Sequence, residues 1–134
     1  MLLAGVTTRA QIIEEPEVAF RLSSESQKPL LMIFSGSDWC APCIRLHDTV
    51  LSNEQFQHYA SDHFILLKVD FPQRKKQDQS KRTANEKLAD KYNPRGQFPH
   101  ILLLNADQSI RSILNYKNQP ADKFISQLSA YFAE

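Results

Sequence analysis

Trp39-Cys40-Ala41-Pro42-Cys43 contains both cysteines of this 134-residue chain, two residues apart. An apolar run, Pro29-Leu30-Leu31-Met32-Ile33-Phe34, leads into this segment, and an amphipathic stretch follows it. The order predicts a buried strand, then the cysteine pair, then a helix. A pair at this spacing serves redox chemistry or supplies half of a zinc site, and zinc needs two further ligands. The sequence has no second cysteine pair, so it favours redox chemistry and predicts no metal; the remaining candidate ligands are scattered: His47, His58, His63 and His100.

The composition is that of an ordinary globular protein, with 42% hydrophobic and 23% charged residues. A chain of this length fits one domain, residues 1–134, with a core that does not depend on disulfide staples. The formal net charge of +1 argues against a dedicated nucleic-acid surface. Two cysteines are too few for a disulfide scaffold, so we expect the pair to have a chemical role.

The first residues, Met1 to Val6, are apolar, but no basic segment precedes them and no long apolar core follows. They do not make a convincing signal peptide, and no stretch of the sequence approaches the length of a membrane span. Two readings stay open: a protein made without an export signal, or a mature form whose signal has been removed. Residues 1–7 are a candidate for a disordered end.

Helical and strand patterns alternate along the chain. Thr8 is expected to cap a first helix that runs to about Ser24, with Pro16 interrupting or restarting it. Later helices are indicated by apolar stripes and the strands by apolar runs. The expected strands are 29–35, 64–70, 101–104 and 109–114, the last two joined by a turn at 105–108. The expected helical stripes are Ile44, Leu46, Val50 and Leu51; residues 54–59; Leu88 and Tyr92; and, after Pro120, Phe124, Ile125, Leu128, Tyr131 and Phe132.

The segment from Phe71 to Asn85 is polar and almost without apolar residues. We interpret it as an insertion that begins as a solvated loop and continues into the helix ending near Tyr92. It is also locally basic, which fits either a solubilising surface or a docking patch for an acidic partner. The basic residues are Arg74, Lys75, Lys76, Lys81 and Arg82.

The order helix-strand-helix-strand-helix-strand-strand-helix predicts an α/β fold, a central mixed sheet with helices on both faces. The whole pattern resembles the three-layer thioredoxin fold. Three segments are also similar to bacterial exported thioredoxin-like proteins of the DsbH type: Phe34 to Cys40, Val69 to Gln73, and Gly96 to Pro99. These proteins carry a long polar insertion after the second segment, which accounts for the insertion at 71–85.

Placement of the cysteines predicts their roles. Cys40 lies at the expected start of a helix, where unpaired N–H groups and the helix dipole favour a thiolate, so we assign it as the nucleophile. Cys43, one turn further in, is expected to resolve the mixed disulfide. The redox-active Cys40–Cys43 disulfide is then the only redox group, with no separate cofactor. The resemblance implies that Trp39 shields the sulfur and lines the substrate surface together with Ala41 and Pro42.

The resemblance also implies that Pro99 follows a cis peptide bond and faces the cysteines. Such a bond is uncommon at an arbitrary proline, so the expectation comes from the family and not from the local sequence. Phe98 would then present backbone groups to an incoming peptide, which pairs with it as an added strand. Thioredoxins usually carry a small or β-branched residue at the position of Phe98, so a bulky ring there reshapes the groove. The segment from Tyr92 to Pro99 is also one residue longer than in thioredoxins.

Three residues near the cysteines in the sequence bear on proton transfer and on the charge of the two sulfurs. The buried acid that helps deprotonate the second cysteine in thioredoxins is replaced here by Phe34. His47 lies one helical turn after Cys43, so it is a candidate for proton transfer, the alternative being a histidine held by a backbone carbonyl. Asp38 acts the other way, because a carboxylate beside Cys40 disfavours the thiolate.

Proline directly before the second cysteine is the thioredoxin choice, so the sequence predicts a reductase of protein disulfides. Its expected partners are disulfide-containing proteins and an electron donor, either a membrane thiol transporter in the periplasm or a thioredoxin reductase in the cytoplasm. We expect a periplasmic monomer that neither binds nucleic acid nor inserts into a membrane, with a cytoplasmic location as the alternative. An oxidase or isomerase, and a binding module whose cysteines are incidental, stay open as functions.

Overall fold

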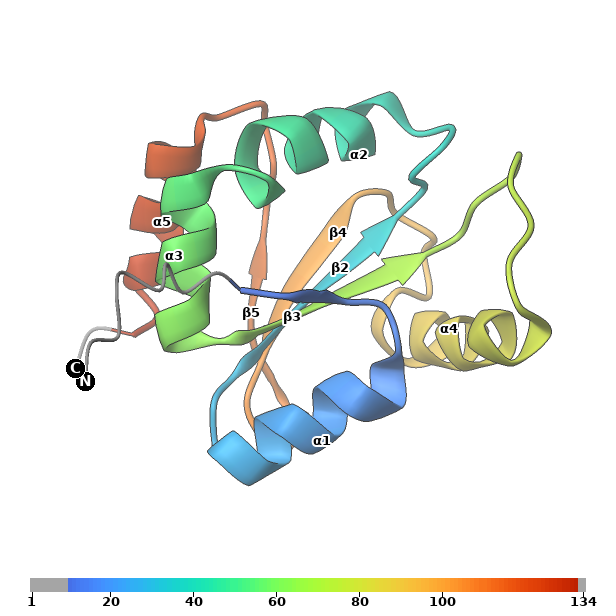
Figure 1. Cartoon of the computed structure of the whole chain (residues 1–134), viewed down its shortest axis with the longest axis horizontal. Coiled ribbons are helices and arrows are strands. Elements are labelled where there is room, and N and C mark those ends of the chain that lie inside the picture. The colour runs from blue at the N-terminus through green and yellow to red at the C-terminus, as the bar shows by residue number, and fades with distance from the viewer. Residues whose placement is uncertain (1–9, 133–134) are drawn as a thin grey trace, which may run out of the picture.

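The computed structural model describes residues 10–132, and within them a five-stranded sheet forms the centre (Figure 1). The strand order is β1-β3-β2-β4-β5, with β1 and β2 parallel to β3, and β4 antiparallel to both β2 and β5. The strands are β1 (Ile12–Ile13), β2 (Leu30–Ser35), β3 (Ile65–Asp70), β4 (His100–Leu104) and β5 (Ile110–Leu114). This is the mixed sheet of the thioredoxin fold that the sequence predicted.

Helices cover both faces of the sheet (Figure 1). One face carries α1 and α4, and the other carries α2, the π-helical turn η1 that continues it, α3 and α5. The bounds are α1 (Pro16–Ser26), α2 (Ala41–Leu46), η1 (His47–Leu51), α3 (Glu54–His63), α4 (Gln79–Tyr92) and α5 (Ala121–Ser129).

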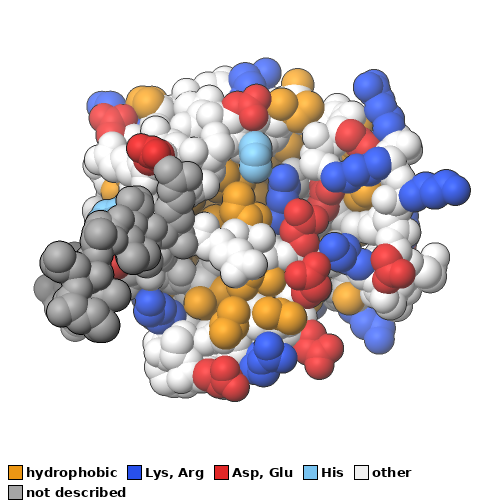
Figure 2. Space-filling view, in the orientation of Figure 1, with side chains coloured by type: hydrophobic (Ala, Val, Ile, Leu, Met, Phe, Trp, Pro, Cys, Tyr) orange, Lys and Arg blue, Asp and Glu red, His pale blue; other side chains and the backbone are white. Residues whose placement is uncertain are grey.

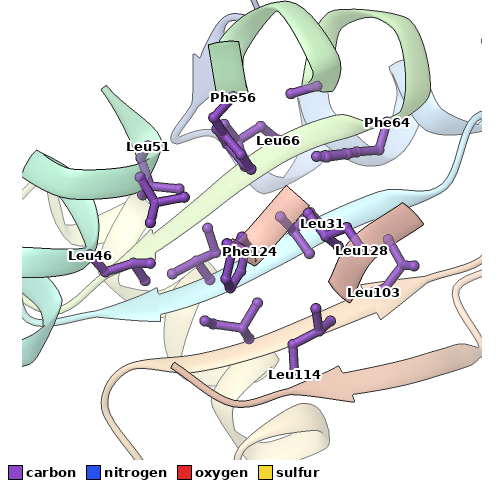
Figure 3. Packing of buried hydrophobic residues seen from close by; sticks show 14 residues of the cluster. Leu31, Leu46, Leu51, Phe56, Phe64, Leu66, Leu103, Leu114, Phe124 and Leu128 are labelled. Atoms are coloured by element: carbon purple, nitrogen blue, oxygen red, sulfur yellow. The ribbon is translucent and has the colours of Figure 1, made fainter. Parts of the chain in front are cut away.

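Each face of the sheet buries its own hydrophobic cluster, because successive side chains of a strand point to opposite faces. Along β2, Leu31 and Ile33 join the cluster under α3 and α5, whereas Met32 and Phe34 join the one under α1 and α4. Figure 3 shows the first cluster, in which Phe124 of α5 packs against Phe56 of α3 with ring centroids 6.0 Å apart. The continuous apolar run of β2 is therefore buried on both sides, as expected of a central strand.

The predicted start of the first helix is wrong. Ile12 and Ile13 form a short strand beside Leu66 and Leu67, and the helix begins only at Pro16. Proline suits this first position because its missing N–H would have no partner inside the helix. The expectations for residues 1–7 and for capping by Thr8 lie outside the described residues.

Two apolar residues placed in helical stripes are exposed instead. Ile44 is 41% exposed, because Cys43 and Leu46 take the inward positions of α2 and the π-helical turn then shifts the spacing to bury Val50. Tyr131 is also 41% exposed, since α5 ends at Ser129.

The polar insertion is a loop only in its first half. Asp78 caps α4 by accepting the N–H groups of Ser80 and Lys81, so the helix begins at Gln79, inside the segment. Leu88 and Tyr92 face the core as predicted. Within residues 10–132, no helix combines the length and the apolar character needed to cross a bilayer.

Candidate active site

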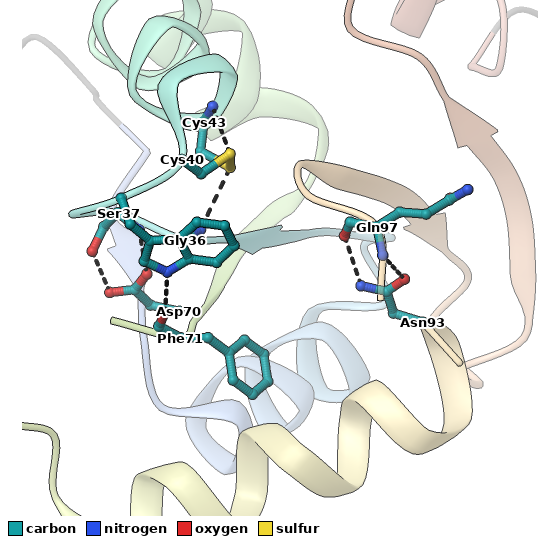
Figure 4. Close-up of a disulfide and its surroundings, with 9 residues drawn as sticks. Gly36, Ser37, Cys40, Cys43, Asp70, Phe71, Asn93 and Gln97 are labelled. Atoms are coloured by element: carbon teal, nitrogen blue, oxygen red, sulfur yellow. Dashed lines mark hydrogen bonds between the residues drawn. A yellow bond between two sulfur atoms is a disulfide. The ribbon is translucent and has the colours of Figure 1, made fainter. Parts of the chain in front are cut away.

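The two cysteines lie where β2 gives way to α2, and they form a disulfide (Figure 4). Their Cα atoms are 5.2 Å apart. Cys40 is the N-cap residue of α2, and its sulfur accepts the N–H of Cys43 at 3.3 Å. Cys40 is 6% exposed and Cys43 is 3% exposed. Both cysteines are buried in the disulfide form, Cys40 slightly less than Cys43, and the role of Cys40 as nucleophile stays a prediction.

The sulfur of Cys43 is in contact with the backbone at the end of β2. It accepts the N–H of Gly36 at 3.4 Å. A hydrogen-bond donor at this distance favours negative charge on the sulfur once the disulfide is reduced. Phe34, at the position of the acid in thioredoxins, is fully buried and belongs to the cluster under α1 and α4. The hydrogen-bond partner of the Cys43 sulfur is therefore a backbone N–H, and Phe34 offers no proton acceptor at the position of the thioredoxin acid.

Trp39 is fixed from two sides. Its Nε1 donates to the carbonyl of Phe71 at 2.7 Å, and its ring lies directly on Gly36. A Cβ atom at Gly36 would stand 2.3 Å from the nearest atom of the indole. The glycine is therefore required by the close approach of this ring, a role that the sequence pattern did not indicate.

Phe98, the residue before Pro99, contacts Trp39. The Phe98–Pro99 peptide bond is cis, as the resemblance implied. The Phe98 ring meets the Trp39 ring edge-on at 5.3 Å between centroids, and it meets the Phe71 ring at 5.8 Å. Three aromatic rings, with Phe98 in the middle, thus form an aromatic wall that includes Trp39, the neighbour of Cys40 in the chain. Phe71 was missed from the sequence because only its neighbours in space distinguish it from any residue at a strand end.

The segment before Pro99 is closed by a single side chain. Asn93 donates through Nδ2 to the carbonyl of Gln97 at 2.8 Å and accepts the N–H of Gln97 at 2.9 Å (Figure 4). Gly96, between them, has φ of 63°, a conformation that favours glycine. The long segment from Tyr92 to Pro99 is therefore a compact turn that fixes the approach to the cis bond.

Asp70, at the end of β3, holds the turn between β2 and α2. Its buried carboxylate accepts the N–H of Ser37 at 2.9 Å and the Ser37 hydroxyl at 2.6 Å. Lys75 places its Nζ 3.7 Å from the same carboxylate. The carboxylate that supports this turn therefore comes from β3, and not from the strand before the cysteines.

Asp38 is engaged by a loop that lies far from it in the sequence. Its carboxylate accepts three backbone N–H groups, from Gln73 at 2.9 Å, Arg74 at 2.8 Å and Lys75 at 2.9 Å. The N–H of Gln73 is the main cause that holds the pKa of Asp38 below its ordinary value. The carboxylate that we expected to oppose the Cys40 thiolate is thus also the anchor of this loop.

His47 begins the π-helical turn, and its backbone N–H bonds to the carbonyl of Cys43. Burial lowers the pKa of its imidazole, and Lys68 adds to the effect, so the ring favours the neutral form. Its Nδ1 is buried without a hydrogen-bond partner among the described residues, so Nδ1 is not held by a carbonyl. A role for His47 in proton transfer stays a prediction.

Ala41 and Pro42 occupy the first turn of α2, with Ala41 exposed and Pro42 half-buried. A groove of about 410 Å³ lies beside the Phe98–Pro99 cis bond. It extends the candidate site from the proline segment towards the end of β5. The groove is lined by Gln97, Phe98, Pro99, His100, Ile113, Leu114, Asn115 and Tyr116.

Comparison with known proteins identifies the family of this chain. A family model described as thioredoxin-like matches residues 11–106. The chain belongs to the thioredoxin-like family. With its Cys40–Cys43 disulfide, this family member is a thioredoxin-like thiol:disulfide oxidoreductase.

Within the thioredoxin-like family, the chain is similar to two proteins of known name and to a solved structure. The chain is 30% identical to the disulfide bond reductase DsbH of Chlamydia pneumoniae over 84% of its own length and 67% of that protein. It is 31% identical to the thioredoxin-related protein DsbJ of the same organism, over 75% of the chain but only 29% of DsbJ. Among solved structures, a DsbH oxidoreductase superimposes with a TM-score of 0.83 at 26% identity, covering 98% of this chain and 92% of that one.

Proposed function

We propose that this protein reduces disulfide bonds of other proteins. The observation that carries the proposal is the disulfide at the start of α2, formed by a pair with proline before its second cysteine, in a chain similar to a disulfide bond reductase. The N-cap position of Cys40 and the backbone donor at Cys43 both support thiolate chemistry at these sulfurs.

The reaction begins with the reduced pair. The Cys40 thiolate attacks one sulfur of the substrate disulfide, forms a mixed disulfide and releases the other substrate sulfur as a thiolate. The Cys43 thiolate then attacks the sulfur of Cys40, closes the Cys40–Cys43 disulfide and releases the second substrate sulfur. Two electrons pass from the dithiol to the substrate, and the two substrate thiolates take up the protons that the dithiol gave up.

Substrate binding follows from the surfaces beside the pair. An extended peptide that pairs with the backbone at Phe98 lies against the aromatic wall and enters the groove beyond Pro99. Each turnover leaves the disulfide form, so the protein needs a donor of electrons. We propose a monomer in the periplasm that is re-reduced by a membrane thiol transporter, and the resemblance to exported DsbH-type proteins supports this location over the cytoplasm and a thioredoxin reductase.

A turnover assay separates reduction from isomerisation. With dithiothreitol as the electron source, we expect the protein to speed the reduction of a disulfide-bonded protein substrate well beyond dithiothreitol alone. The same preparation is expected to recover little activity from a scrambled protein whose disulfides are mispaired. Efficient recovery of the scrambled protein together with slow net reduction would identify an isomerase instead.

A further inference from the structure

A basic loop borders the candidate site on the side of Trp39. The loop, residues 73–76, contains Arg74, Lys75 and Lys76, all exposed. Figure 1 shows this segment between β3 and α4 reaching the end of the molecule where β2 turns into α2. Figure 2 shows Lys and Arg side chains gathered at the same end. The loop follows directly on Phe71 and Pro72, and so on the aromatic wall.

The backbone of this basic loop is fixed. Asp38, two residues before Cys40, accepts three of its N–H groups. On either side, the N–H of Phe71 bonds to the carbonyl of Ser35 at 2.9 Å, and Gln77 Nε2 donates to the carbonyl of Asp70 at 3.0 Å. A surface that is already ordered loses little conformational entropy when a partner binds. The same contacts keep the loop at a constant position relative to the cysteine pair.

The cations of the loop differ from those of α4 in their partners. Lys81 lies 3.2 Å from Glu15, and Arg82 lies 3.4 Å from Glu86. By contrast, across residues 10–132 no carboxylate lies within 4.0 Å of the side-chain nitrogens of Arg74 or Lys76. Lys75 has one such neighbour, Asp70, at 3.7 Å. The charges of Arg74 and Lys76 are therefore available to a partner, whereas Lys75, Lys81 and Arg82 each have a carboxylate neighbour within the chain.

We propose that the basic loop binds acidic side chains that flank the substrate disulfide, so that the protein selects acidic segments of its protein substrates. This inference rests on the proposed reductase function. Arg74 can take a carboxylate in a two-pronged hydrogen-bonded pair, and the two lysines add charge attraction. Because the loop is held by Asp38, in the turn that leads into Cys40, an acidic residue bound there brings its neighbouring disulfide to the nucleophile.

Three synthetic peptides test the selection. All carry the same disulfide, flanked by Asp and Glu, by Asn and Gln, or by Lys, and kcat/KM for reduction is measured for each. We expect the acidic peptide to be preferred over the neutral one by about fivefold at low salt, since a few exposed charge pairs act together. The preference is expected to shrink at high salt, because exposed charges are screened.

Matched variants locate the effect. Replacing Arg74 and Lys76 by Gln is expected to remove the preference and to leave kcat/KM for the neutral peptide unchanged. Lys75 is kept, because its side chain lies beside the Asp70 carboxylate that holds the turn before Cys40. The control replaces two exposed cations of α4 by Gln, which removes the same charge and is expected to keep the preference. The control residues are Lys87 and Lys91.

The outcomes separate the inference from the function on which it rests. Equal reduction of acidic and neutral peptides by the wild type would overturn the selection and leave the reductase function intact. Loss of the preference in the α4 control as well would assign it to net charge alone and would also overturn the proposal. Reduction of none of the peptides would reject both. Binding of the loop to anionic vesicles or to nucleic acid, with no preference among the peptides, would point to a different partner and count against the proposal.

Discussion

Replacing Cys43 by Ser is expected to trap the protein on its substrate as a stable mixed disulfide. Cys40 can still attack, but a serine hydroxyl in place of the second thiol cannot displace the substrate from the Cys40 sulfur, so the second step stops. Net turnover is expected to be lost, because each protein molecule stays bound to substrate after one attack. Alkylation after mixing, followed by mass spectrometry without reductant, detects the adduct on Cys40.

The matched control is Cys40→Ser, which removes the attacking thiolate. This variant is expected to lose turnover to a similar degree but to form no comparable adduct, because Cys43 is only 3% exposed and does not reach an incoming disulfide. An adduct that forms equally well in Cys40→Ser would reverse the roles assigned to the two cysteines.

Replacing Gly36 by Ala is expected to disturb both stability and the site. The new Cβ atom would stand 2.3 to 2.6 Å from three atoms of the Trp39 ring, so the ring must move. Overpacking of this kind typically costs about 1–3 kcal/mol in the free energy of unfolding. Displacement of the ring also breaks its contact with Phe98, so we expect slower turnover. Urea unfolding, monitored by circular dichroism, measures the change in the free energy of unfolding.

Trp39, the one tryptophan of the sequence, shows separately whether its indole ring has moved. Its fluorescence emission is expected to shift in Gly36→Ala, because the indole leaves its place over the glycine. Gly96→Ala is the matched control, since nothing lies within 4 Å of the position that its Cβ would take and only its φ of 63° resists a side chain. That variant is expected to lose about 1 kcal/mol while keeping the emission of the wild type. An unshifted emission and unchanged stability in Gly36→Ala would contradict the described packing.

Local patterns in the sequence predicted the central part of the fold. The apolar runs indicated β2, β3 and β4 to within a residue or two, since a buried strand is recognisable from its own residues. Resemblance to known proteins added the cis bond at Phe98–Pro99, which no local pattern establishes.

Features that depend on distant partners could not be predicted from the sequence. Ile12 and Ile13 are a strand only because they pair with β3, more than fifty residues later in the chain. The π-helical turn depends on a bond from the Ser52 N–H to the His47 carbonyl that no spacing of apolar residues indicates. At the site, the contacts of Trp39 with Phe71 and of Asp38 with the basic loop likewise join segments that only the folded chain brings together.

The direction of electron flow is the central claim, and the equilibrium reduction potential of the Cys40–Cys43 pair tests it most directly. The protein is equilibrated in dithiothreitol or glutathione buffers of known potential, and the fraction of disulfide is measured by alkylation and mass spectrometry. We predict a value near that of thioredoxin, about −270 mV, at which the dithiol gives electrons to substrate disulfides. A value near about −120 mV, that of the oxidant DsbA, would contradict the account and make the protein a donor of disulfides.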